Sequence, residues 1–284
     1  MENLMPKTLN EALAFLAKHE ALIINGGTDV MVQKRTLSEM PLAFSKPTLY
    51  LKSLKALNYI KRDNQTVHIG ATTPYESMLY DENIPALFKT CLKLFASPGI
   101  RNMGTLAGNI GNASPAADGV LMLYLYDATI TLKAHQKQRS LPIENLITGV
   151  KQTSKNAGEL ITNIAFELPS FTHTFFKKVG GRKSDAISKV SFAGAANVID
   201  GKIKDIRLAF GAINTTVIRD KSFEASLKGQ TPQRLIAQLK DIKAHYAPLI
   251  KPIDDQRSNA KYRHKVALNL CEAFIRTLEE KNDG

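Results

Sequence analysis

Residues 100–119, IRNMGTLAGNIGNASPAADG, are rich in small and polar residues and stand directly before an apolar run, VLMLYLYDATITL. Three glycines and four asparagine or serine residues precede a proline and an aspartate in this stretch. Such residues leave the backbone uncovered and contribute little to a hydrophobic core. Bare backbone beside a buried segment indicates contact with a ligand, and a phosphate-bearing cofactor is the prediction that follows.

A second glycine-containing segment, INGGTDV at residues 24–30, follows a short apolar run at 21–24 that is typical of a buried strand. Neither segment has the GxGxxG spacing or the Gly-Lys-Ser/Thr ending of nucleotide-binding loops, which disfavours Rossmann and nucleotide-hydrolase folds. Both segments suit a diphosphate, because a diphosphate needs several backbone N–H donors at close range and glycine removes the side chains that would block its approach. Two ordinary turns are the alternative interpretation.

Short polar residues within the two segments, among them Thr28, Thr105 and Asn109, add further hydrogen-bonding groups. Asp118 suits a ribose or ribityl hydroxyl, since a carboxylate placed directly against the phosphates would repel them. The alternative for Asp118 is a cap on a helix that starts near Gly119.

Hydrophobic periodicity predicts helices and strands in mixed order along the chain. Thr8 and Glu11 predict a capping box for a helix over 8–19, and Asp200-Gly201 predicts a hairpin turn between strands at 190–200 and 203–213. Further helices are expected over 74–95 with a break at Pro85, over 120–126, and in several segments after 222. Strands are expected over 48–51, 59–62, 66–71, 127–135 and 159–169, with a turn and short helix over 138–149 and a linker near 170–174.

Composition narrows the functional classes. The net charge is +12, from 38 basic and 26 acidic residues, but the positive residues are dispersed and no nucleic-acid-binding motif accompanies them, so we expect an anionic cofactor or an acidic partner and no nucleic acid. Cys91 and Cys271 are too few to hold an iron–sulfur cluster, and the six histidines show no metal-ligand spacing, so no metal site is expected. The chain has no apolar run long enough for a membrane span and no signal-peptide pattern, which predicts a cytoplasmic protein.

INGGTDV together with PGIRNMGTLAGNIGNASPAADGVLMLYLYDATITL resembles the FAD-binding medium subunit of the molybdenum hydroxylases, of the xanthine, aerobic carbon monoxide and nicotinate dehydrogenase types. That family has an AGGTD-like loop and a second loop of the form IRN-x-x-T-I-G-G-N-I-x-x-A-S-P-x-x-D. Asn25 replaces the usual alanine, and Ala107 replaces the first glycine of the GGN group, which adds a methyl group near the expected diphosphate. The similarity extends to residues 158–164, 176–191 and 253–270, so it covers the whole chain.

The resemblance implies an α+β fold. Residues 1–170 would form a two-subdomain FAD-binding domain of the vanillyl-alcohol oxidase (PCMH) type. Residues 174–284 would form a carbon monoxide dehydrogenase flavoprotein-like domain, with a three-stranded antiparallel sheet and helices. The implied cofactor is FAD, with no catalytic side chain and no metal on this chain.

The resemblance also implies a heterotrimer. A large subunit would bind molybdopterin and oxidise the substrate, and a small subunit would carry [2Fe–2S] clusters. This chain would take electrons from the clusters onto FAD and pass them to NAD, a quinone, oxygen or another acceptor. A self-sufficient FAD-dependent oxidoreductase, similar to UDP-N-acetylenolpyruvoylglucosamine reductase, is the alternative, although the C-terminal part shows no obvious catalytic serine, cysteine or histidine set.

Site residues follow from the same motif matches. Phe95 and Ala96 would form an apolar wall, Ile161 would contact the flavin side of the pocket, and Lys178, or alternatively Lys177, would lie near the flavin ring. The two loops would supply the other cofactor-binding residues, which are Asn25, Gly26, Gly27, Thr28, Asp29, Val30, Ile100, Thr105, Gly108, Asn109, Asn112 and Asp118.

Overall fold

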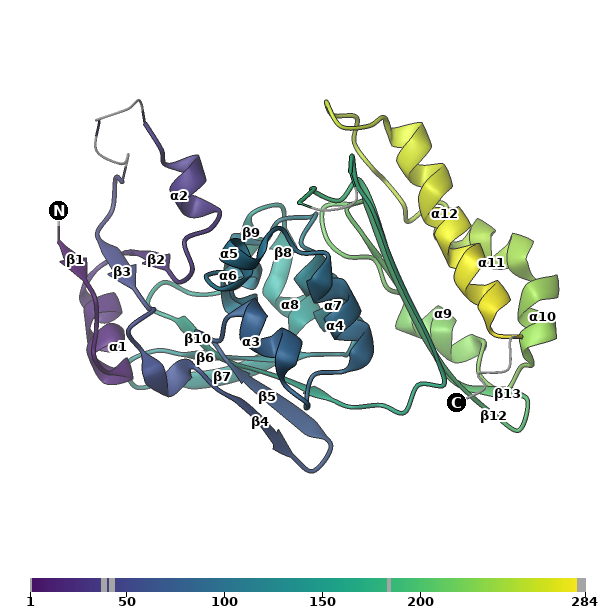
Figure 1. The fold of residues 1–284 in the computed structure, drawn as a ribbon, viewed down its shortest axis with the longest axis horizontal. Helices are drawn as coiled ribbons and strands as arrows, with labels where there is room; N and C mark the ends of the chain where they lie inside the picture. Colours follow the sequence, from purple (N-terminus) through teal and green to yellow (C-terminus); the bar gives the residue numbers. More distant parts are fainter. Residues whose placement is uncertain (1, 37–39, 41–43, 183–184, 280–284) are drawn as a thin grey trace. The chain divides into compact units, whose positions relative to one another are not determined.

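The computed structural model describes residues 2–36, 40, 44–182 and 185–279. The chain forms two compact units, which Figure 1 shows as a ribbon. Unit 1 comprises Met1–Pro85, Ala96–Ala113 and Asp127–Glu167, and unit 2 comprises Ala86–Phe95, Ser114–Tyr126 and Leu168–Gly284. Two short segments from the first half of the sequence therefore belong with the C-terminal residues.

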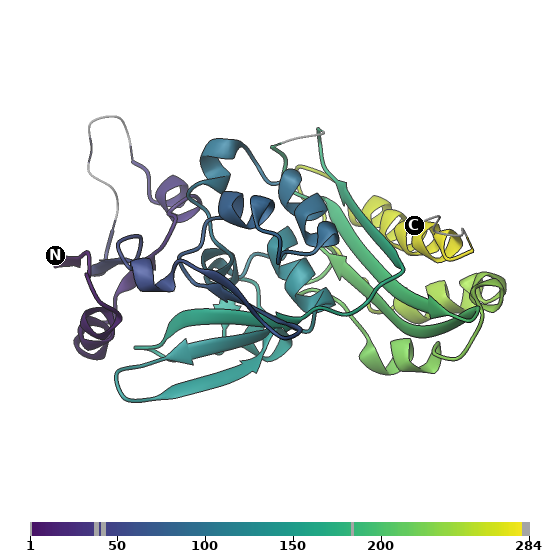
Figure 2. The same ribbon diagram turned by 60° about the horizontal axis from the view of Figure 1, so that its bottom comes forward.

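Unit 1 contains two larger sheets. The first is parallel, has the order β1-β3-β2, and is accompanied by helix α1; the bounds are β1 Asn3–Leu4, α1 Leu9–Lys18, β2 Leu22–Ile24 and β3 Thr48–Tyr50. The second is antiparallel, has the order β4-β5-β10-β6-β7, and can be followed in Figure 2. Its strands are β4 Ile60–Asp63, β5 Thr66–Gly70, β6 Thr129–Lys133, β7 Gln138–Pro142 and β10 Leu160–Glu167. Strand β7 is a correction, because its segment was expected to be a turn.

The remaining elements of unit 1 are short. They are α2 Val30–Gln33, a 3-10 helix at Lys55–Leu57, α3 Tyr75–Tyr80, α5 Pro98–Arg101, α6 Leu106–Asn112, α8 Ile143–Leu146, β8 Ile147–Gly149 and β9 Gln152–Thr153. Helices α5 and α6 occupy the stretch that was expected to be uncovered loop. The reason is local: Pro98 starts α5, the Thr105 side chain caps α6, and Leu106 and Ile110 bury one side of α6.

Unit 2 is built on an antiparallel sheet of β11 His173–Val179, β12 Val190–Ile199 and β13 Lys202–Gly211. Asp200 and Gly201 form the predicted hairpin turn, both with positive φ. The helices of this unit are α4 Ala86–Lys93, α7 Asp118–Leu125, α9 Lys221–Ser226, α10 Pro232–Ala237, α11 Leu239–Tyr246 and α12 Ala260–Thr277. Helices α9 to α12 lie on one side of the sheet (Figure 1), while α4 packs on β11 and α7 on β12 and β13.

Aromatic side chains form much of the core of unit 2. The ring centroid of Phe210 lies 4.9 Å from that of Phe192 and 4.8 Å from that of Tyr246, and all three residues are fully buried. Gly194 of β12 lets Phe274 of α12 approach the sheet, because a Cβ at this position would lie 2.5 Å from the Phe274 ring. The close packing fixes α12 against the sheet.

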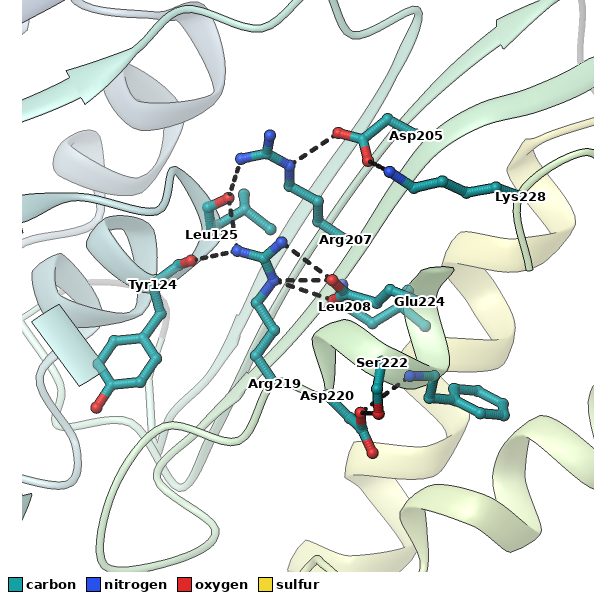
Figure 3. Close-up of polar contacts among 11 residues, drawn as sticks. Tyr124, Leu125, Asp205, Arg207, Leu208, Arg219, Asp220, Ser222, Glu224 and Lys228 are labelled. Atoms are coloured by element: carbon teal, nitrogen blue, oxygen red, sulfur yellow. Dashed lines mark hydrogen bonds and ion pairs between the residues drawn. The ribbon is translucent and has the colours of Figure 1, made fainter. Parts of the chain in front are cut away.

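Helix α7 is buried along its whole length, so its C-terminal carbonyls need partners inside the protein. Arg219 and Arg207 supply them (Figure 3). The Arg219 Nη1 atom donates to the Tyr124 carbonyl at 2.6 Å, and Arg207 Nη1 donates to the Leu125 carbonyl at 2.8 Å. Glu224 pairs with Arg219 at 3.0 Å. These contacts fix the helix whose first residue is Asp118.

No helix in the described part of the chain combines the length and the apolar character that a membrane crossing requires.

Candidate functional site

The first glycine loop leaves β2 at Ile24 and enters α2 at Val30. Gly27 has φ +72°, a backbone conformation that favours glycine. Gly26 is needed for a different reason, because a Cβ there would lie 2.0 Å from the carbonyl oxygen of Met103. The missing side chain of Gly26 therefore makes room for the backbone just before the second loop. The predicted contact of Gly26 with a phosphate stays a prediction.

Asn25 connects the two loops within unit 1. Its Nδ2 atom donates to the carbonyl of Ala71 at 2.6 Å and to the Thr105 hydroxyl oxygen at 2.9 Å. The same hydroxyl oxygen accepts the backbone N–H of Gly108 at 3.0 Å and so caps α6. Asn25, which replaces the usual family residue, therefore connects the first loop to the start of α6.

The first loop retains unused donors. Among the described residues, none accepts a hydrogen bond from the backbone N–H groups of Gly26, Gly27, Thr28 or Asp29. Near the second loop, the Asn109 Oδ1 atom is buried and has no hydrogen-bond partner. Buried polar atoms are nearly always paired, so this acceptor indicates a ligand donor. A cofactor that brings phosphate oxygens together with hydroxyl or amine donors fits this arrangement, and FAD has both.

Helix α6 presents two different sides. Gly108 and Gly111 are exposed, and a Cβ at Gly111 would meet nothing within 4 Å. Ala107 is buried in unit 1 together with Leu106. The methyl group of Ala107 therefore adds to the packing of unit 1, and its expected place near a diphosphate stays a prediction.

Lys151 was not predicted from the sequence, yet it contacts both loops. It lies in the turn between β8 and β9, and its Nζ atom is 3.3 Å from Asp29 Oδ2 and donates to Asn112 Oδ1. Its backbone N–H donates to the Ala113 carbonyl at 2.9 Å. The turn carries no motif, so only the fold reveals this connection.

The other predicted residues of unit 1 lie in different surroundings. Ala96 has positive φ, and Ile100 lies in α5 with an exposed side chain. Ile161 is buried in β10, beside an irregularity in the ladder with β6. A core role accounts for Ile161 by itself, and its contact with a flavin stays a prediction.

Three predicted residues, Phe95, Asp118 and Lys178, come together in unit 2. The Lys178 Nζ atom lies 3.0 Å from Asp118 Oδ2 and 6.0 Å from the centroid of the Phe95 ring. The two charged side chains are only 11% and 5% exposed. Ser188 Oγ donates to both carboxylate oxygens of Asp118, at 2.7 and 2.9 Å. Asp118 is thus paired inside the unit, and its predicted contact with a cofactor hydroxyl stays untested.

The neighbouring lysine behaves differently. Lys177 is exposed, while the Lys178 ammonium also donates to the Leu94 carbonyl at 3.3 Å. Of the two lysines that the sequence left open, Lys178 is the one in contact with other predicted site residues.

The thiols of the two cysteines are unreactive. Burial raises the pKa of the Cys91 thiol well above its usual value, and the nearby Asp118 carboxylate raises it further. Burial raises the pKa of Cys271 to about 12. Both thiols are therefore protonated at neutral pH and unsuited to nucleophilic attack or metal binding. Within the described ranges, His, Cys, Asp and Glu side chains form no group of three or more that would hold a metal ion.

Comparison with known protein families assigns the chain. Residues 1–170 match the model described as the FAD binding domain in molybdopterin dehydrogenase. The chain belongs to this family. Residues 175–278 match the carbon monoxide dehydrogenase flavoprotein C-terminal domain. The chain is accordingly an oxidoreductase subunit with FAD as its cofactor, as the resemblance of its motifs to this family implied. The predicted boundaries 1–170 and 174–284 stay a prediction, since the compact units interleave along the chain.

Individual relatives agree with this assignment. The chain is 30% identical over 266 residues to the glyceraldehyde dehydrogenase medium chain of Sulfolobus acidocaldarius, which covers 92% of each protein. It is 31% identical over 209 residues to the nicotinate dehydrogenase FAD-subunit of Eubacterium barkeri, with 70% of this chain and 69% of that one covered. The structure of carbon monoxide dehydrogenase from Hydrogenophaga pseudoflava matches with a TM-score of 0.86 at 21% identity, over 99% of this chain and 98% of that one. The predicted α+β fold is therefore confirmed.

Proposed function

We propose that this chain is the electron-transfer subunit of a multi-subunit molybdenum hydroxylase. It takes electrons from [2Fe–2S] clusters of a partner subunit and passes them to NAD, a quinone, oxygen or another acceptor. The observation that carries the proposal is the set of unused N–H donors at Gly26–Asp29, beside the Thr105-capped helix α6, in a chain of this family. FAD, when bound, supplies the redox chemistry by exchanging electrons with both partners.

The residues of unit 1 have separate tasks in this proposal. The N–H groups of Gly26 to Asp29 bind the diphosphate of FAD, because they are close together and no described residue uses them. Asn25 and Thr105 hold the loops in place. Asn109 Oδ1 accepts a hydrogen bond from the cofactor.

We infer partner subunits because electron transfer through [2Fe–2S] clusters needs metal ligands that this chain does not supply. A [2Fe–2S] cluster needs about four protein ligands, usually thiolates, and the sequence has two cysteines. We infer that a small subunit supplies the clusters and that a large molybdopterin-binding subunit oxidises the substrate. The net charge of +12 favours an acidic partner surface. Among the relatives, one from Paenarthrobacter nicotinovorans is named as a subunit of a dehydrogenase complex.

The purified single chain tests this function. We expect one FAD per chain, released unchanged on denaturation because neither loop contains a histidine for a covalent link. With NADH and an artificial dye the holoprotein should show at most slow dye reduction. Hydroxylation of a purine, an aldehyde or an N-heterocycle should require co-expression with the two other subunits. Substrate oxidation by the pure chain, free of molybdenum and iron, would instead favour the self-sufficient flavoenzyme.

A further inference from the structure

Lys151 joins two segments that are distant in sequence. Its ammonium contacts Asp29, 122 positions earlier, and Asn112, 39 positions earlier. The backbone of the same residue is fixed on the end of α6, because its N–H donates to the Ala113 carbonyl at 2.9 Å. Lys151 and Ala113 both have positive φ. The backbone anchor places the start of the Lys151 side chain beside both loops.

The charge of Asp29 explains why a cation is needed here. Its carboxylate belongs to the loop whose free N–H groups are offered to a diphosphate. A carboxylate in that position repels a diphosphate, and the Lys151 ammonium 3.3 Å away offsets the repulsion. The side chains are 47% and 52% exposed, so the pair contributes little to folding. The pair is therefore better suited to ligand binding than to stability.

We propose that Lys151 is a positioning residue for FAD, which acts by neutralising Asp29 while Asn112 holds its ammonium in place. The inference rests on the proposed binding of the FAD diphosphate at Gly26–Asp29. It adds a residue outside the two family loops, from a turn that carries no motif.

The test measures the dissociation constant of FAD by flavin fluorescence for the full chain and four variants. Lys151→Met should bind FAD roughly tenfold more weakly, since it leaves the Asp29 charge uncompensated. Lys151→Arg should keep near-parental affinity. Asp29→Asn removes the charge that repels the diphosphate and should bind FAD more tightly than the parent, while the Lys151→Met/Asp29→Asn double variant, whose net charge equals that of the parent pair, should recover to within about threefold of the parent. The affinity loss of Lys151→Met should shrink as salt is raised from 50 mM to 500 mM.

A matched control removes one positive charge elsewhere in unit 1. Lys137→Met changes an exposed lysine in the turn between β6 and β7, and it should leave FAD affinity unchanged. Thermal unfolding of the FAD-free proteins should be the same for Lys151→Met and Lys137→Met. Parental affinity in Lys151→Met, or a double variant as weak as Lys151→Met alone, would overturn the proposal. Absence of FAD binding by the parent and by Lys137→Met would instead count against the proposed function.

Discussion

The side-chain amide of Asn25 donates to the Thr105 hydroxyl oxygen at 2.9 Å, across 80 positions of sequence. The same oxygen caps α6 by accepting the N–H of Gly108. One hydroxyl therefore links the first loop, the second loop and the start of a helix. Thr105 is buried, so the loss of Asn25 removes a hydrogen bond at a buried site, and the loss of the Thr105 hydroxyl also leaves the Gly108 N–H without its cap.

A double-mutant cycle on this pair gives the first prediction. Asn25→Ala, which restores the usual family residue, should lower the free energy of unfolding by about 1 kcal/mol and weaken FAD binding several-fold. Thr105→Ala should cost about 1 kcal/mol through the lost cap. Because the two side chains share a hydrogen bond, the free energy of unfolding of the double variant should fall by less than the sum of the two single losses. The margin should be roughly 0.5 kcal/mol or more. Urea unfolding of the FAD-free parent, the two single variants and the double variant measures the four free energies. Strictly additive losses would contradict the coupling.

A second prediction concerns Gly26. In Gly26→Ala the new methyl group would overlap the Met103 carbonyl, so the two loops must separate. We expect at least a hundredfold loss of FAD affinity and a lowered melting temperature, since overpacking typically costs about 1–3 kcal/mol. Gly111→Ala is the control for stability, because its methyl group would enter open space and alanine favours a helix by up to about 1 kcal/mol over glycine. Equal melting temperatures for Gly26→Ala and the parent would show that the loops do not depend on this close approach.

Local signals explain which elements were predictable. Helix α1 was expected because apolar residues recur at helical spacing, and the Thr8 hydroxyl accepts the Glu11 N–H as the capping box requires. The Glu11 carboxylate, however, accepts the N–H of Lys7 instead of that of Thr8. Helix α6 was missed because glycine and asparagine have low helix propensity, and it forms because Leu106 and Ile110 are buried.

Partners far apart in sequence explain what could not be predicted at the site. The motifs placed Asn25, Thr105 and Asp118 among the cofactor-binding residues, but no periodicity pairs Asn25 with Thr105. The hydrogen bond from Ser188 to Asp118 spans 70 positions, and the contact of Lys151 with Asp29 spans 122. Such contacts depend on how strands and helices pack, and sequence patterns are local.

The buried pair of Lys178 and Asp118 gives a third prediction. Removing one partner leaves a buried charge without compensation, so Asp118→Asn and Lys178→Met should each lower the free energy of unfolding by about 3 kcal/mol. The double variant leaves neither charge in this site, so its free energy of unfolding should fall by clearly less than the sum of the two single losses. Lys177→Met serves as the control, since Lys177 is exposed and should change stability by less than about 0.5 kcal/mol. Additive losses in chemical denaturation would show that the two charges do not interact.

The last prediction concerns the pH dependence of Glu159, which precedes β10. Arg139 donates to both of its carboxylate oxygens, at 2.7 and 2.9 Å, and the Asn156 backbone N–H donates at 2.7 Å. The hydrogen bonds from Arg139 are the main reason why the pKa of Glu159 is lowered to about 2, against an ordinary value of 4.5. A lowered folded-state pKa stabilises the fold above the unfolded-state pKa, and this contribution is lost as pH falls from about 5 to 2. Because Arg139 is 39% exposed, we expect the contribution at pH 7 to be about 1–2 kcal/mol.

Glu159→Gln keeps the size of the side chain and removes its charge, so it should lower the free energy of unfolding by that amount at pH 7. The difference from the parent should narrow below pH 5 and be mostly lost by pH 2, because the parent carboxylate becomes increasingly protonated as pH approaches its folded-state pKa of about 2. Glu167→Gln, at the exposed end of the same strand, should stay within about 0.5 kcal/mol of the parent throughout. Urea unfolding at steps of pH from 7 to 2.5 measures the three curves. A difference for Glu159→Gln that stays constant over this range would mean that its cost comes from altered packing, and not from the charge held by Arg139.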